Sequence, residues 1–171
     1  MRIAIGSYYR TGSTWLYNSV RTIFEDDGCS ITVHGDCDVV PYSTDVCIHK
    51  VHDFSNELYA AADCTLTITR EYAAADASFE RAFNHPIDAE KRKQSIDAAE
   101  KWKQFADITF EMQMIESNAA QIISDIMHLI DMECTDERIA DITQRVMAIK
   151  PNPKLIQDPE TLYFANHITS S

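Results

Sequence analysis

The chain has 171 residues, and its 27 acidic side chains against 15 Lys and Arg give a formal net charge of −12. This charge argues against long-range attraction to nucleic acid or to anionic lipid. An apolar fraction of 45% with only 4 Gly and 5 Pro excludes a collagenous or disordered chain. The length suits one domain, residues 1–171, built around one hydrophobic core.

In chain order the sequence first predicts a strand at residues 2–6, a helix from Ser13 that stops near Gly28, and strands at 30–34, 45–51 and 64–70. Helices at 73–83 and 87–106 and a strand at 107–112 follow. The last elements are two amphipathic helices, whose apolar side chains lie between Ala119 and Ile130 and between Ile139 and Ile149. The helices follow from apolar side chains at helical spacing, and the strand at 64–70 from strict alternation with Thr. Strands that alternate with helices predict an α/β fold with a parallel sheet covered on both faces. A ligand site then belongs at the carboxyl ends of the strands.

The five cysteines are odd in number and contain no C-x-x-C pair, which predicts reduced thiols and no zinc or other metal site. The apolar segment at residues 2–6 is too short for a secretory signal. No apolar run approaches the ~20 residues of a membrane span. These features lead us to expect a cytoplasmic protein.

The segment between the first strand and the first helix has the composition of a phosphate-binding loop. It contains residues 10–15, RTGSTW, in which Gly12 allows the backbone to approach an anion closely. The N–H groups of this segment open a helix, whose dipole favours negative charge, and Ser13 and Thr14 add hydroxyl donors. The alternative interpretation is an ordinary N-capped helix, because Ser and Thr are common caps.

The loop does not match the nucleotide-triphosphate pattern G-x-x-x-x-G-K-[ST]. Five residues separate Gly6 from Gly12, and Ser13 stands where that pattern requires Lys. The cation of this loop is Arg10, which precedes the second Gly.

Residues 10–15 resemble the phosphosulfate loop of the sulfotransferases that use 3′-phosphoadenosine 5′-phosphosulfate (PAPS). That loop carries Lys or Arg, then Ser or Thr, Gly, two hydroxyl residues and often Trp, a pattern that this segment fits at every position. The resemblance implies a P-loop NTPase-like three-layer α/β fold with a central parallel sheet of about five strands. It also implies that the 5′-phosphosulfate is bound by Arg10, Thr11, Gly12, Ser13 and Thr14 and that Trp15 stacks on adenine. The alternative role of Trp15 is packing of the first helical turn.

Two further segments resemble the same family in the same order. Lys50 and His52 match a K-x-H motif at the end of the third strand, where the resemblance implies that His52 is the catalytic base. Lys50, together with Arg10, would stabilise the charge that develops on the leaving phosphate. Side chains two residues apart on a strand point the same way, so both can reach one reacting centre. The alternative is that both are exposed residues at a strand end.

Arg70 closes the fourth predicted strand and Ser78 follows eight residues later, a spacing that in the family holds the 3′-phosphate. The Asp that the family often places four residues after this Arg is Ala74 in this chain. The family's basic, Gly-containing closing loop is not recognisable near the C-terminus. Candidates for part of its role are Lys150, Lys154 and His167.

The expected function is transfer of a sulfuryl group from PAPS to a hydroxyl or amine of a small-molecule acceptor, with 3′,5′-adenosine bisphosphate (PAP) as product and neither nucleic acid nor membrane as partner. The sequence does not specify the acceptor or the oligomeric state. One alternative is a small P-loop nucleotide or nucleoside kinase. The presence of Ser13 where the P-loop pattern requires Lys argues against it. The other is a non-catalytic nucleotide-binding protein of the same fold.

Overall fold

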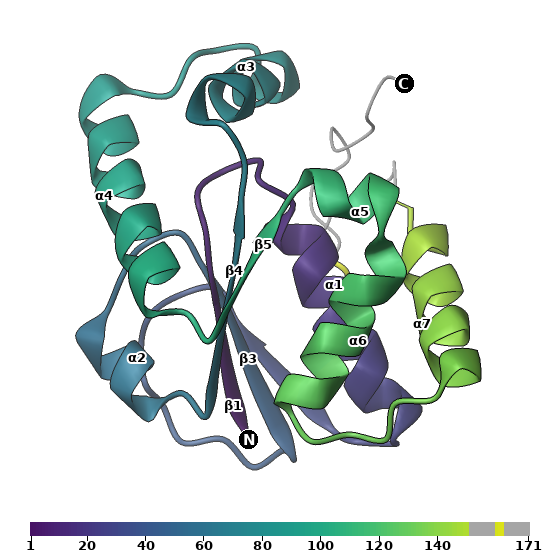
Figure 1. Ribbon diagram of the computed structural model, residues 1–171. Coiled ribbons are helices and arrows are strands. Elements are labelled where there is room, and N and C mark those ends of the chain that lie inside the picture. The colour runs from purple at the N-terminus through teal and green to yellow at the C-terminus, as the bar shows by residue number, and fades with distance from the viewer. Residues whose placement is uncertain (151–159, 163–171) are drawn as a thin grey trace.

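A parallel sheet of five strands forms the centre of the computed structural model, which describes residues 1–150 and 160–162 (Figure 1). The strands are β1 (Arg2–Gly6), β2 (Ile31–His34), β3 (Val46–Val51), β4 (Cys64–Thr69) and β5 (Ile108–Glu111). They lie in the order β2-β3-β1-β4-β5, and every neighbouring pair is parallel. The predicted α/β fold with a central parallel sheet of five strands is confirmed.

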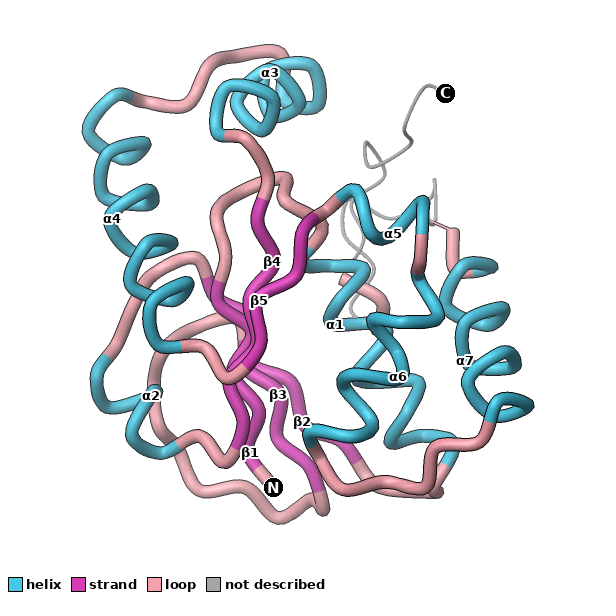
Figure 2. Tube along the Cα trace, in the orientation of Figure 1, coloured by secondary structure: helices cyan, strands magenta, loops and turns pink. Residues whose placement is uncertain are grey.

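Helices cover both faces of the sheet (Figure 2). They are α1 (Ser13–Asp26), α2 (Asn56–Ala61), α3 (Tyr72–Phe83), α4 (Ala89–Phe105), α5 (Gln113–Ser117), α6 (Ala119–Leu129) and α7 (Asp136–Ala148). One face carries α1, α6 and α7, and the other carries α2 and α4. Helix α3 lies beyond the carboxyl end of β4 (Figure 1). Among the described residues, no helix combines the length and apolar character of a membrane span.

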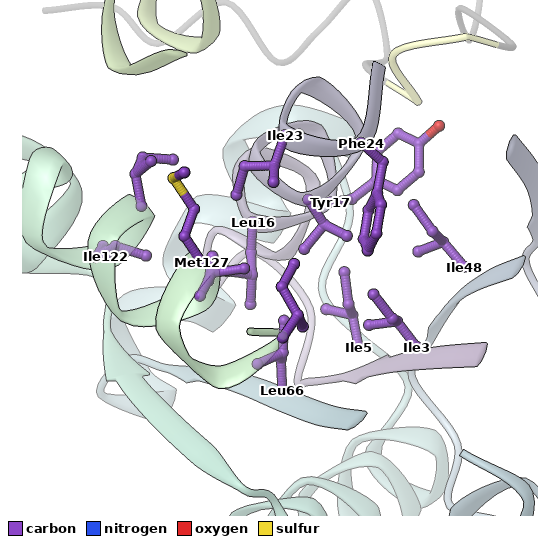
Figure 3. Packing of buried hydrophobic residues seen from close by; sticks show 14 of the residues in the cluster. Ile3, Ile5, Leu16, Tyr17, Ile23, Phe24, Ile48, Leu66, Ile122 and Met127 are labelled. Atoms are coloured by element: carbon purple, nitrogen blue, oxygen red, sulfur yellow. The ribbon is translucent and has the colours of Figure 1, made fainter. Parts of the chain in front are cut away.

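The alternation of side chains along β1 divides the interior into two parts. Ile3 and Ile5 point toward α1 in the larger cluster, which α6 and α7 complete (Figure 3). Ala4 faces the opposite side and packs with the fully buried Trp102 of α4. The small side chain of Ala4 therefore leaves room for an indole ring directly on the sheet.

The predicted helices and strands agree with the structure to within a few residues, but α2 and α5 were not predicted. Helix α2 has six residues, and Leu58 is its fully buried side chain. It begins where the Ser55 side chain accepts a hydrogen bond from the Leu58 N–H. A helix of less than two turns shows too little apolar periodicity to be recognised from sequence.

Candidate functional site

The candidate site lies where the loops that follow β1, β3 and β4 meet. Strand β1 is the middle strand of these three, and Gly6 at its end pairs with Val51 of β3 and Thr67 of β4. The carboxyl ends of parallel strands share one edge of the sheet. The structure thus brings the loop after Gly6, the K-x-H segment and Arg70 to a common edge.

The loop after β1 reaches α1 through two left-handed backbone conformations. Arg10 has φ 58° and Gly12 has φ 98°, and Gly12 is the N-cap residue of α1 without any capping side chain. The predicted alternative of a Ser or Thr cap is therefore not how α1 begins, because Ser13 and Thr14 lie within its first turn. An Arg in this backbone region is strained by about 1–2 kcal/mol. Such strain is typical of functional loops.

The first turn of α1 presents unused hydrogen-bond donors. Its first helical bond runs from the Leu16 N–H to the Gly12 carbonyl, at 3.0 Å. The N–H groups of residues 13–15 have no acceptor in the part of the chain that the structure describes. The Thr11 hydroxyl donates to the Tyr8 carbonyl at 2.8 Å, which closes the loop on itself. Donors at the positive end of a helix suit a phosphate or sulfate group.

Arg10 connects this loop with the segment after β4. Its Nε donates to the Ser78 Oγ at 3.2 Å, and Nη1 of Arg70 donates to the Arg10 carbonyl at 3.4 Å. Burial, and then the charges of Arg70 and Arg81, lower the pKa of Arg10. The three arginines form a positive cluster, and within residues 1–150 and 160–162 none of them is paired with a carboxylate.

His52 follows β3 directly, and its ring is fixed in one tautomer. Its Nδ1 lies 2.8 Å from the Ser7 carbonyl oxygen, which can only accept, so Nδ1 carries the proton. Nε2 is then the nitrogen with a lone pair. Burial, together with the charges of Lys50 and Lys91, lowers the pKa of His52 to about 4. The imidazole is therefore neutral at pH 7 and can accept a proton at Nε2.

Lys50 precedes His52 by two residues on β3 and is partly buried. Burial lowers the pKa of its ammonium group to about 8. No described residue forms an ion pair or a hydrogen bond with the Lys50 side chain. A cation without a counterion beside a neutral imidazole is a favourable place for an anionic ligand.

Side chains from α3 and α4 that the sequence did not indicate also border this site. Phe79 of α3 and Lys91 of α4 both contact Tyr9, with 5.7 Å between the Phe79 and Tyr9 ring centroids and 5.6 Å from the Lys91 Nζ to the Tyr9 ring centroid. The centroid of the Tyr9 ring in turn lies 4.4 Å from that of the His52 ring. Arg81 joins the arginine cluster from α3. One signal in the sequence could have found Arg81, because it follows Ser78 by three residues and so shares its helical face.

The remaining predicted site residue, Trp15, packs into the larger core cluster and is 7% exposed. Its indole Nε1 is buried and has no hydrogen-bond partner among the described residues. Stacking of Trp15 on adenine remains a prediction. Of the basic candidates near the C-terminus, Lys150 is exposed after α7, and Lys154 and His167 lie outside the described residues.

No family model and no curated protein matches this sequence. Among solved structures, the chain is similar to the mouse sulfotransferase SULT7A1 complexed with PAP, with a TM-score of 0.62 and 12% identity over 85% of this chain and 64% of that one. It is also similar to retinol dehydratase in complex with androsterone and the inactive cofactor PAP, with a TM-score of 0.59 and 11% identity over 85% of this chain and 64% of that one. The chain thus spans less than two thirds of the length of both structures. At this identity the likeness shows the fold: the chain has the P-loop-like α/β architecture of these two structures.

Proposed function

We propose that this protein binds PAPS and transfers its sulfuryl group to a hydroxyl or amine of a small acceptor. The observation that carries the proposal is the convergence of Arg10, Arg70 and Lys50 on one sheet edge, where none of them has a carboxylate partner among the described residues. In a chain with a net charge of −12, cations without counterions mark the place for an anionic ligand.

The residues at this edge suit a ligand with two separate anionic groups. The N–H groups at the start of α1, with Arg10, would bind the 5′-phosphosulfate, and Arg70 with Ser78 would bind the 3′-phosphate. The two similar sulfotransferase-fold structures were both solved with PAP, which supports the choice of this nucleotide over ATP.

The geometry of His52 and Lys50 supports a role for both in transfer. Bound PAPS supplies a sulfuryl group that is already activated by its phosphate. His52 Nε2 accepts the proton of the acceptor hydroxyl, while the Ser7 carbonyl holds the ring by its Nδ1–H. The Lys50 ammonium stabilises the negative charge that develops on the leaving phosphate oxygen.

Ligand-induced thermal stabilisation tests the proposal against both alternatives. We expect PAP to stabilise the protein more than AMP or Mg-ATP, because a ligand that binds only the folded state stabilises it by RT ln(1 + [L]/Kd). Stabilisation by Mg-ATP with none by PAP would support the kinase instead. Turnover of PAPS with a broad panel of alcohols and amines is then expected, and stabilisation by PAP without any turnover would support the non-catalytic protein.

A further inference from the structure

Arg81 is the member of the arginine cluster that belongs to none of the sequence motifs and does not directly follow a strand. Arg81 lies on α3 with an exposed side chain, and no described residue forms an ion pair with it. Outside the cluster, four described arginines pair with carboxylates, namely Arg21, Arg92, Arg138 and Arg145, and Arg2 donates to the Val40 carbonyl. In so acidic a chain, an arginine beside two others and without a counterion requires an explanation.

The geometry of α3 places Arg81 on the helix face that also carries Ser78. The helix begins at Tyr72, two residues after Arg70, and its Ala75 is fully buried against the Tyr8 ring cluster. Ser78 and Arg81 are three residues apart and therefore share one face of the helix. Because the Ser78 Oγ accepts a hydrogen bond from Arg10 Nε at 3.2 Å, this face borders the loop.

The nearby carboxylate of Asp76 is already engaged. Its two oxygens accept hydrogen bonds from the Tyr8 hydroxyl at 2.5 Å and from the Arg92 Nε at 2.6 Å. This arrangement ties α3 to α4 and to the start of the loop, and among the described residues it leaves Arg81 without a carboxylate partner. Three neighbouring guanidinium groups repel one another, and the repulsion is relieved when a dianion binds among them.

We propose that Arg81 binds the 3′-phosphate together with Arg70 and Ser78 and thereby determines the preference for a 3′,5′-bisphosphorylated nucleotide. The inference rests on the proposed function and names an additional specificity-determining residue within it. The planar guanidinium group can donate two parallel hydrogen bonds to phosphate oxygens, and its exposed position on α3 gives it no other evident structural role.

Calorimetric titration of PAP and AMP against Arg81→Ala tests this role. We expect the Kd for PAP to rise about tenfold and the Kd for AMP to change by less than about twofold, because only PAP carries the 3′-phosphate. Arg81→Lys keeps the charge but not the paired donors, so its Kd for PAP should lie between those of the wild type and Arg81→Ala. The matched control is Lys93→Ala, which removes another exposed positive charge, from α4, and should leave both Kd values unchanged.

The outcomes separate this inference from the proposed function. A wild-type protein that binds PAP no better than AMP would contradict the proposed function itself. A wild-type preference for PAP that survives in Arg81→Ala would overturn the role of Arg81 alone. An equal loss of PAP and AMP affinity would also overturn it, because Arg81 would then act at the 5′-phosphate. Unchanged melting temperatures of the unliganded variants confirm that each one is folded.

Discussion

At the scale of single residues, His52 is the side chain on which transfer should depend most. We expect His52→Ala to reduce kcat/KM on the order of 10²–10⁴-fold, the usual effect of removing a general base. PAP binding should change little, because in the proposed mechanism the imidazole contacts the acceptor hydroxyl and not the phosphates. The control is His128→Ala, which removes an exposed imidazole on α6. If the His52 variant retained more than about a tenth of the wild-type rate, the base would lie elsewhere.

The pH dependence of transfer should report His52 and Lys50 together. The pKa of His52 is lowered to about 4, so kcat/KM should rise with pH as its imidazole loses a proton. The pKa of Lys50 is lowered to about 8, so the rate should fall above that pH as the ammonium group becomes neutral. The plot of kcat/KM against pH should therefore be bell-shaped, with midpoints near pH 4 and pH 8.

Lys50→Arg provides the matched control for the alkaline limb. Arg stays protonated to a pH above about 12, so the fall in kcat/KM on the alkaline side should disappear while the acid limb stays in place. An acid limb near the ordinary imidazole pKa of about 6.5 would contradict the buried position of His52.

Arg10 should contribute to binding through its guanidinium group and not through its backbone. We expect Arg10→Ala to weaken PAP and PAPS alike by about 1.5–3 kcal/mol, because both ligands present a 5′-phosphate to the loop. Arg10→Gly is the control, since Gly adopts the observed φ of 58° without strain. Equal loss in both variants, measured by calorimetry, assigns the effect to the side chain. Recovery of affinity in Arg10→Gly would assign it to the backbone.

Much of the candidate site could be proposed from sequence because its parts are short motifs that each follow a strand. This rule places residues 10–15, Lys50 with His52, and Arg70 with Ser78 at strand ends, and the parallel sheet brings these motifs to one edge. Arg81 could not be identified so directly. Its relevance depends on how α3 is oriented by Ala75 and by the bond between Arg10 and Ser78, and no local pattern encodes that orientation.

At the scale of elements, the contact between β1 and α4 should be sensitive to a single methyl group. A Cβ added at Gly6 would lie 2.1 Å from the Trp102 ring, which is fully buried and donates through Nε1 to the Asp53 carbonyl at 2.9 Å. We therefore expect Gly6→Ala to destabilise the protein by about 2–4 kcal/mol in urea unfolding, because the fully buried and hydrogen-bonded ring would have to shift.

Gly35→Ala is the matched control for this substitution. A Cβ at Gly35 meets no atom within 4 Å, so its effect on the free energy of unfolding should stay within about 0.5 kcal/mol. Equal stability of Gly6→Ala and wild type would show that α4 can shift away from the sheet. The close approach of Trp102 was not predictable from the helical stripe that contains it, because the stripe does not specify which strand residue it faces.

At the scale of the whole molecule, the chain carries far more acidic than basic side chains, and this imbalance should dominate its response to salt. Several of the described ion pairs, such as that of Asp26 with Arg145, join partly exposed side chains. Each surface pair contributes only about 0–1 kcal/mol, and salt weakens it. Repulsion within a net charge of −12 destabilises the folded state over longer distances, and salt screens that repulsion as well.

We expect the relief of repulsion to exceed the loss of ion pairs, so that the free energy of unfolding at pH 8 rises on the order of 1 kcal/mol between low and moderate NaCl concentrations. Urea unfolding at 25 °C in a NaCl series measures this change. Choline chloride should give the same rise, because screening does not depend on the cation. The Arg81→Ala variant should show the same rise in the free energy of unfolding. A rise confined to the wild type would instead indicate chloride bound at the arginine cluster. A fall in stability with salt would mean that the surface ion pairs outweigh the repulsion between the excess carboxylates.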